Sequence, residues 1–350
     1  MSRRMTPPLP RDLKSLLIVC PSWVGDSVMA TPILRAARLF LPEARLIVAA
    51  RCGLDGLLGG APWPDELITL DMGGLLGPLR AAGAIRRRRP QAALLLPNSF
   101  RSALAVRLSG TPIRVGYDRD GRGMLLTHRL AVQRSTAPTP AIEYYARLGA
   151  YALGTETLET DMELFVSDEE AAAAEKLLAD VDGPFIVLNP GASKPEKRWP
   201  AARFAEVADA LHKSHGLRAV VSGSPGEKDI LDAVVGAADS PVINLARRGV
   251  NLASLKAVIK RAALMITNDT GPRHIAAALG TPVVSLFGPT DHRWTARPRV
   301  SERILLAEPF LPDDLIADRH PKLCAIDRIG VSDVIAAAEA LLGASPTEGR

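Results

Sequence analysis

The sequence predicts an α/β protein built from two open, doubly wound domains. Short runs of Val, Ile, Leu and Ala alternate with helix-length amphipathic segments, and both halves of the chain repeat this scheme. Strands that are apolar throughout are typical of a parallel sheet whose faces are both covered by crossover helices. A chain of 350 residues is also too long for one ordinary hydrophobic core. We therefore expect two domains of the same class.

The elements follow in order along the chain. In the first half, apolar runs predict strands at 16–20, 45–50, 66–70 and 92–96, and periodicity predicts helices at 27–41, 76–89 and 101–108. In the second half, strands are expected at 185–189, 219–222, 264–267 and 283–286. Helices are expected there at 171–179, where Ser167 is the predicted cap, and at 201–215, 227–236, 272–279 and 331–342.

The stretch 154–166 is rich in Thr and Glu and has no strong strand signal, which indicates a connection between domains. The predicted organisation is an N-terminal domain at 1–160, a C-terminal domain at 167–328, and a C-terminal helix and tail at 329–350.

Composition excludes several classes of protein. No apolar run approaches the roughly 18 to 20 residues of a membrane span, and no apolar segment follows Arg3 and Arg4 as a signal peptide requires. Cys20, Cys52 and Cys324 are odd in number and widely spaced, so neither a disulfide framework nor a zinc site is expected. A cytoplasmic protein is predicted.

Charge differs between the halves. Residues 1–154 carry 21 lysines and arginines against 10 acidic residues, whereas residues 155–350 carry 22 against 28. The basic half indicates an anionic partner such as nucleic acid, an acidic membrane surface or a phosphorylated substrate. Solvated faces of an Arg-rich chain are the alternative. Nucleic acid is disfavoured because aromatic residues are only 4% of the chain and no nucleic-acid-binding motif occurs.

Open α/β sheets bind ligands beyond the carboxyl ends of their strands, so the loops there are candidate sites. The first such loop places Asp26 directly after the first strand and at the start of a helix. A carboxylate in that position suits a general base. The alternative is that Asp26 or Ser27 caps the helix.

Two loops of the second half suit a nucleotide diphosphate. After the strand at 185–189, Ser193 offers a hydroxyl and Lys197 a positive charge, although an exposed surface loop is the alternative. After the strand at 264–267, Asp269, Thr270 and Gly271 precede a helix whose free N–H groups favour negative charge, although a plain capped helix is the alternative. Glu227, in a neighbouring loop, could accept hydrogen bonds from ribose hydroxyls. No G-x-G-x-x-G follows the first strand of either half, which argues against a nicotinamide oxidoreductase.

Three motifs carry a resemblance to a known family: PSWVGD at 21–26, KRWP at 197–200 and NDTGxxHxAAAL at 268–279. Together they resemble the ADP-heptose:lipopolysaccharide heptosyltransferases of glycosyltransferase family 9, and the first motif is more similar to heptosyltransferase II than to I. The resemblance covers most of residues 15–295. It departs at Pro272-Arg273, where the family usually has a small or apolar pair.

The resemblance implies a GT-B fold, in which two Rossmann-like domains face a central cleft. The first domain would bind the acceptor and the second the nucleotide sugar. The implied reaction moves L-glycero-D-manno-heptose from ADP-heptose to the lipopolysaccharide inner core, on a heptosyl-Kdo2-lipid A type acceptor, with inversion and without a metal. It implies a peripheral location on the cytoplasmic face of the inner membrane, an anionic glycolipid as acceptor, and no nucleic acid.

By position, the resemblance implies that Asp26 is the catalytic base and that Lys197 and Ser193 bind the diphosphate. Asp269, Thr270 and Gly271 would lie near the sugar and phosphates, and Glu227 would contact the ribose. The alternatives are a related GT-B transferase with another nucleotide sugar or acceptor, and a non-catalytic nucleotide-binding module, which would have no use for Asp26.

Overall fold

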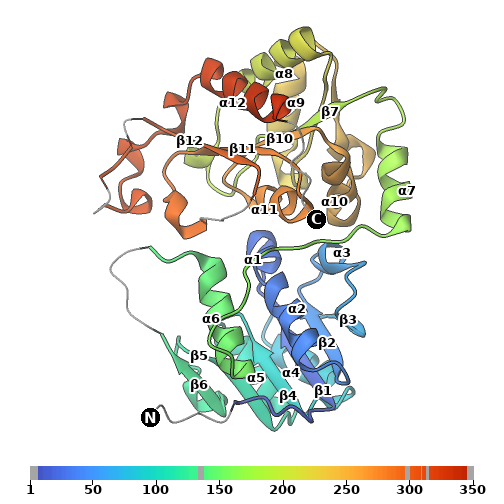
Figure 1. Cartoon of the computed structure of the whole chain (residues 1–350), viewed down its shortest axis with the longest axis vertical. Coiled ribbons are helices and arrows are strands. Elements are labelled where there is room, and N and C mark those ends of the chain that lie inside the picture. Colours follow the sequence, from blue (N-terminus) through green and yellow to red (C-terminus); the bar gives the residue numbers. More distant parts are fainter. Residues whose placement is uncertain (1–6, 133–137, 296–299, 309, 313–314, 345–350) are drawn as a thin grey trace. The chain divides into compact units, whose positions relative to one another are not determined.

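The computed structural model describes residues 7–132, 138–295, 300–308, 310–312 and 315–344. Arg3 and Arg4, considered above for a signal peptide, lie outside the described residues, as do 345–350 of the predicted tail. The chain forms two compact units, Met1–Phe165 and Val166–Arg350 (Figure 1).

The first unit contains a six-stranded parallel sheet with the strand order β3-β2-β1-β4-β5-β6. Its strands are β1 (Ser15–Val19), β2 (Arg45–Ala50), β3 (Glu66–Thr69), β4 (Ala92–Leu95), β5 (Ile113–Asp118) and β6 (His128–Ala131). The first four match the predicted strands to within one residue. The last two were not predicted, because β5 carries Arg114 and Gly116 and β6 alternates half-buried with exposed residues.

Helices cover both faces of this sheet. On one face, α6 (Ala141–Leu153) packs against α1 (Val24–Met29) and α2 (Thr31–Phe40). On the other, α4 (Gly77–Arg86) packs beside α5 (Phe100–Leu108), and their apolar residues form one core cluster with alternate residues of the strands (Figure 1). A short helix, α3 (Asp55–Leu58), and a 3-10 turn, η1 (Gly123–Leu125), lie in loops.

The predicted helix at 27–41 is two helices. It begins earlier, at Val24, and is interrupted at Ala30. Pro32 explains the break, because its nitrogen has no hydrogen to donate to the carbonyl of Val28. The hydroxyl of Thr31 donates to that carbonyl instead, at 2.8 Å.

The second unit repeats the topology of the first. Its six parallel strands have the order β12-β11-β10-β7-β8-β9. They are β7 (Phe185–Asn189), β8 (Arg218–Val221), β9 (Val242–Asn244), β10 (Leu264–Asn268), β11 (Val283–Phe287) and β12 (Glu302–Leu306). In each unit the first strand therefore lies between the second and the fourth, which is the Rossmann arrangement. The predicted fold class is confirmed for both units.

The described residues of the second unit form six α-helices around its sheet: α7 (Asp168–Leu177), α8 (Ala201–His215), α9 (Lys228–Ala237), α10 (Leu252–Arg261), α11 (Gly271–Leu279) and α12 (Val331–Gly343). Ser167 caps α7 in a capping box with Glu170, as predicted. Val334 and Ala338 of α12 are fully buried in the main core cluster of this unit. The terminal helix therefore belongs to the core of the second unit.

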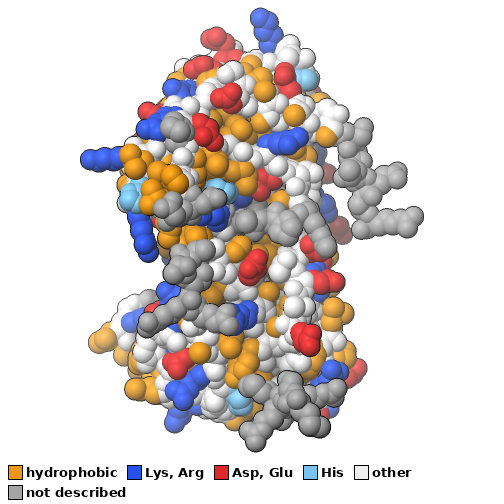
Figure 2. Space-filling model, turned by 60° about the vertical axis from the view of Figure 1, so that its left-hand side comes forward, with side chains coloured by type: hydrophobic (Ala, Val, Ile, Leu, Met, Phe, Trp, Pro, Cys, Tyr) orange, Lys and Arg blue, Asp and Glu red, His pale blue; other side chains and the backbone are white. Residues whose placement is uncertain are grey.

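The surface is mixed in character. On the face shown in Figure 2, basic, acidic and hydrophobic side chains are interspersed rather than separated by type. Among the described residues, none of the helices has both the length and the hydropathy to cross a bilayer.

Candidate active site

In both sheets all strands run parallel, so their carboxyl ends meet at one edge of each sheet. Every candidate site residue lies in a loop or helix start that follows such an end. Asp26 follows β1 of the first unit. Ser193 and Lys197 follow β7, Glu227 follows β8, and residues 269–271 follow β10 of the second unit.

Asp26 lies in the first turn of α1 and does not cap it. The N-cap position is Trp23, with an extended backbone, and no side chain caps the helix. The hydroxyl of Ser27 donates to the carbonyl of Pro21 at 2.9 Å. The alternative that Asp26 or Ser27 caps the helix is therefore wrong, and the Asp26 carboxylate is available for another role.

The Asp26 carboxylate is held by a tyrosine from a distant part of the chain. Tyr145, in the first turns of α6, donates a hydrogen bond from Oη to Asp26 Oδ1 at 2.8 Å. Burial of Asp26 raises its pKa above the usual range, and the Tyr145 hydrogen bond opposes that rise because it favours the charged carboxylate. A carboxylate with a raised pKa and a fixed orientation has the properties of a general base.

A second group of contacts fixes the start of α6. Tyr144 stacks on Tyr117, with ring centroids 4.0 Å apart, and donates to Asn98 Oδ1 at 3.0 Å. Arg122 is fully buried and donates to the same amide oxygen at 3.3 Å and to the carbonyl of Tyr117 at 3.0 Å. The loops after β4 and β5 thereby set the position from which Tyr145 reaches Asp26.

In the second unit, buried asparagines tie together the two loops that were predicted to bind the diphosphate. Asn189, at the end of β7, donates to Thr270 Oγ1 at 3.2 Å. Asn268, at the end of β10, donates to the carbonyl of Pro190 at 2.8 Å and accepts from the backbone N–H of Trp199 at 3.2 Å. These contacts cross the switch point between β7 and β10, where doubly wound sheets bind ligands.

The loop with the cations is anchored by its neighbours. Trp199 is buried and donates from Nε1 to the carbonyl of Ile329 at 3.0 Å, and Arg198 donates from Nε to the carbonyl of Ala192 at 2.9 Å. Lys197 directly precedes these two anchoring residues, at the end of a 3-10 turn, η2 (Pro195–Lys197), and is half-buried, whereas Ser193 is exposed. The backbone that carries Lys197 is therefore fixed while its side chain can reach a ligand.

Glu227 ends a 3-10 turn, η3 (Pro225–Glu227), and its carboxylate accepts from the backbone N–H and the hydroxyl of Ser224, both at 2.7 Å. The carboxylate lies directly over Gly191, where a Cβ atom would collide with it. Because residue 191 is a glycine, the Glu227 carboxylate can lie against the loop after β7, which is one of the two loops predicted to bind the diphosphate.

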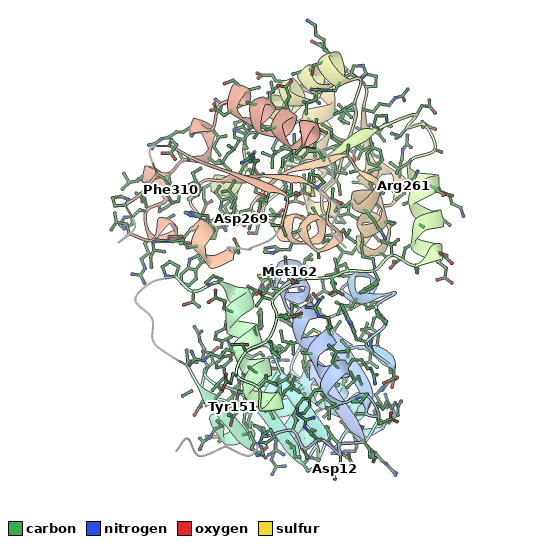
Figure 3. The ribbon with its side chains drawn as sticks, viewed as in Figure 1. Asp12, Tyr151, Met162, Arg261, Asp269 and Phe310 are labelled. Carbon is green, nitrogen blue, oxygen red and sulfur yellow. The ribbon has the colours of Figure 1, made fainter. Side chains whose placement is uncertain are left out.

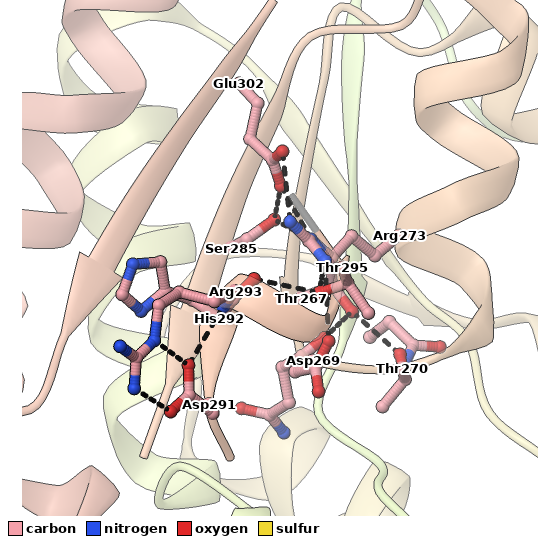
Figure 4. A network of polar contacts seen from close by, with 12 residues as sticks. Thr267, Asp269, Thr270, Arg273, Ser285, Asp291, His292, Arg293, Thr295 and Glu302 are labelled. Carbon is pink, nitrogen blue, oxygen red and sulfur yellow. Dashed lines mark hydrogen bonds and ion pairs between the residues drawn. The ribbon is translucent and has the colours of Figure 1, made fainter. Parts of the chain in front are cut away.

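Asp269 belongs to a buried polar network (Figure 4). Arg273 has no exposed surface, and its guanidinium contacts Asp269 Oδ1 at 3.5 Å, Glu302 Oε1 at 2.6 Å and Thr295 Oγ1 at 2.7 Å. It also lies over the ring of Phe287, 4.6 Å from the centroid. Asp269 itself is 12% exposed and lies on the loop after β10 (Figure 3). Arg273, at a position that departs from the family pattern, therefore fixes the loop after β10.

Gly271 begins α11, with Thr270 in an extended conformation at the N-cap position. No side chain caps this helix start in the described part of the unit. The first-turn amides and the helix dipole there favour an anion.

Sequence reasoning missed Tyr145, Asn98, Arg122, Asn189 and Asn268 as members of these networks. The asparagines carry a usable signal, because Asn189 and Asn268 end buried strands and Asn98 follows the end of β4 by three residues. Tyr145 carries none, since its partner is 119 positions away in the chain.

Within the described ranges, no group of three or more His, Cys, Asp and Glu side chains could hold a metal ion. The sequence contains Asp118-Arg119-Asp120, a superficial D-x-D motif. Asp118 ends β5 and Asp120 has a φ of 55° in a turn, with its carboxylate 3.6 Å from Arg119 Nε.

Comparison with known proteins is consistent with this arrangement. Residues 79–312 match the sequence profile of glycosyltransferase family 9 (heptosyltransferase). The chain is 32% identical over 296 residues to lipopolysaccharide heptosyltransferase 2 of Escherichia coli (strain K12), an alignment that covers 80% of this chain and 84% of that protein.

Two solved structures are similar over nearly the whole chain. The E. coli ADP-heptose lps heptosyltransferase II has a TM-score of 0.80 and 27% identity, covering 94% of this chain and 98% of that one. A glycosyl transferase of family 9 from Veillonella parvula DSM 2008 shares the fold, with a TM-score of 0.83, 23% identity, and coverage of 96% and 99%. The chain therefore belongs to glycosyltransferase family 9, the heptosyltransferase family.

Proposed function

We propose that this glycosyltransferase transfers L-glycero-D-manno-heptose from ADP-heptose to the inner core of lipopolysaccharide, on a heptosyl-Kdo2-lipid A type acceptor. The observation that carries the proposal is the Asp26 carboxylate, raised in pKa by burial and oriented by Tyr145, at the carboxyl edge of the first sheet. Similarity to lipopolysaccharide heptosyltransferase 2 supports the choice of donor and acceptor.

The proposed step is a direct displacement at the anomeric carbon. Asp26 takes the proton from an acceptor hydroxyl as its oxygen forms the new glycosidic bond, and the bond from the anomeric carbon to the diphosphate breaks with inversion. Tyr145 holds Oδ1 of the carboxylate, which leaves Oδ2 to receive the proton.

The second unit binds the donor and stabilises the departing ADP. Lys197 and the start of α11 at Thr270 and Gly271 offset the charge that develops on the diphosphate. The Ser193 hydroxyl donates a hydrogen bond to the diphosphate, and the Glu227 carboxylate accepts hydrogen bonds from the ribose hydroxyls. Asp269, held by Arg273, contacts the sugar. Fixed protein charges supply this stabilisation, so we expect turnover without a metal.

The acceptor is an anionic glycolipid, so we propose peripheral association with the cytoplasmic face of the inner membrane. The basic excess of residues 1–154 supports this proposal. Each cation near an anionic leaflet contributes about 1 kcal/mol, and salt screens this contribution.

The test is incubation of the full chain with ADP-heptose and a truncated lipopolysaccharide acceptor, with and without EDTA. The released ADP and the mass of the product are measured. We expect stoichiometric ADP and a product heavier by one heptosyl residue. A family relative with another specificity would turn over only with a different nucleotide sugar or acceptor. A non-catalytic module would bind ADP-heptose without releasing ADP, and either result would contradict the proposal.

A further inference from the structure

Exposed hydrophobic side chains of the first unit gather at one edge of its sheet. Of the seven large hydrophobic residues that the described part of this unit exposes, six lie on loops or first helical turns that follow the carboxyl ends of strands: Trp23, Leu75, Leu76, Leu79, Phe100 and Met124. The seventh, Leu39, lies near the carboxyl end of α2, and a helix that returns antiparallel to the strands ends at the opposite edge. Hydrophobic residues exposed singly and at random would be spread over both edges of the sheet.

Four of the six lie on two segments that hydrogen bonds hold together, and we call these four the edge patch: Leu75, Leu76, Leu79 and Phe100. Their exposed fractions are 92%, 57%, 56% and 43%. The side chain of Arg101, next to Phe100, donates to the carbonyls of Met72 and Gly74 in the loop before Leu75. The start of α5 is thus bound to the loop that carries the leucines.

The backbone turns these leucines outward. Gly77 is buried against Met72, and a Cβ atom at position 77 would collide with the Met72 carbonyl group. The chain therefore folds back tightly behind Leu75 and Leu76, and the tip of the loop faces solvent. Leucines held in this way contribute little to the core, which indicates an external partner.

We propose that the edge patch docks this protein on the surface of a lipid bilayer, and this inference rests on the proposed function. Asp26 follows β1 at the same sheet edge, so a membrane docked on this edge would present its glycolipids on the side of the sheet that carries the proposed base. Leucines and a phenylalanine at the level of the headgroups bury apolar area.

The charges beside the patch fit the same partner. Arg80 follows Leu79, and its side chain is 57% exposed although it pairs with Asp71 at 3.0 Å. Arg101 is exposed beside Phe100. Arginines that border apolar side chains can keep their guanidinium groups at the level of lipid phosphates while the apolar parts enter deeper.

The test compares the full chain with the variant Leu75→Ser/Leu76→Ser/Leu79→Ser in co-sedimentation with vesicles of phosphatidylethanolamine and phosphatidylglycerol. The matched control is Leu39→Ser, which removes a leucine that is 75% exposed at the other edge. All these leucines are exposed, so thermal unfolding should be unchanged. We expect the triple variant to lose about tenfold or more in vesicle affinity and the control to lose none.

Salt separates the two contributions to binding. The part due to basic residues should weaken as salt rises, whereas the part due to the edge patch should persist in high salt and be absent from the triple variant. Equal binding by parent and triple variant would overturn the proposal. So would a parent that binds no vesicles, or a patch that instead holds two copies together, seen as a change of mass in solution on substitution.

Failure of the docking proposal is distinguishable from failure of the proposed function. With a deacylated, water-soluble acceptor, the triple variant should turn over like the parent, because the patch is not needed. With the acceptor in vesicles it should be slower by about the loss in affinity. A parent inactive on both acceptors would contradict the proposed reaction but leave the vesicle result standing.

Discussion

Tyr145 Oη lies 2.8 Å from Oδ1 of Asp26, so the carboxylate proposed as the base receives a hydrogen bond from α6, the last helix of its own unit. The contact has two effects on the carboxylate. It stabilises the ionised carboxylate that burial disfavours, and it fixes which oxygen remains to accept a proton. The pKa of Tyr145 is itself raised by burial and by the neighbouring carboxylate, so the tyrosine stays protonated and remains a donor.

The first prediction concerns this hydrogen bond. In Tyr145→Phe the donor is lost, so the pKa of Asp26 rises further and less of the base is ionised at a given pH. We expect the acidic limb of the kcat/KM profile to move to higher pH by about one unit, because a hydrogen bond to a charged group contributes about 1.5 kcal/mol or more. Tyr151→Phe, at a half-buried site of the same helix where the hydroxyl donates to the carbonyl of Arg129, is the control. An unshifted limb would show that Tyr145 does not act through Asp26.

The second prediction concerns the base itself. Asp26→Asn should lower turnover by about 10² or more with little change in ADP affinity, because only the transition state uses the carboxylate. Turnover is measured by release of ADP and affinity by calorimetry. Asp12→Asn, at an exposed position of the same unit, should be neutral. Retained turnover in Asp26→Asn would reject the assignment.

The third prediction concerns the free energy of unfolding of the same variant, Asp26→Asn, and how it changes with pH. A carboxyl whose pKa is raised on folding binds its proton more tightly in the native state, so its contribution to stability is lost as pH rises through the folded pKa. Asp26→Asn removes this loss. We expect the variant to equal or exceed the parent in free energy of unfolding at neutral pH, as sites that trade stability for activity do. Urea titrations at acidic and neutral pH measure it, and a variant destabilised at neutral pH would contradict it.

Lys197 gives the fourth prediction. Lys197→Gln should weaken ADP binding by about tenfold or more, since a hydrogen bond from a charged group is lost. Calorimetry with ADP measures the effect. Lys213→Gln, exposed on α8, is the control. Unchanged affinity would place Lys197 outside the donor site.

The fifth prediction concerns Arg273, buried between Glu302 and Asp269. Arg273→Met leaves Glu302 charged and without this partner, so it should lower the free energy of unfolding by about 3–5 kcal/mol. Arg273→Met/Glu302→Gln should recover most of that loss, yet still bind ADP-heptose more weakly, because Asp269 is no longer held. Unfolding and donor affinity are measured on both variants. Full recovery of donor binding in the double variant would limit Arg273 to a structural role.

The sequence predicted the central strands and the edge strand β3, and missed β5, β6, β9 and β12. Strands β1, β4, β7 and β10 are buried on both faces, so their residues form continuous apolar runs. Outer strands such as β6 and β12 are partly exposed and carry charged residues, and β9 has only three residues. Their positions in the sheet depend on pairing with a neighbouring strand, which the local pattern of apolar and polar residues does not predict.

By itself, the sequence determined the fold class, the family and the positions of the loops that carry the candidate site, because buried strands and short motifs are local properties of a chain. Only the tertiary structure decided which groups meet. Tyr145 reaches Asp26 across 119 positions, and Asn268 ties the β7 loop to the end of β10. It also decided that the leucines after β3 face outward. Contacts of this kind form only when parallel strands bring their carboxyl ends to a common edge.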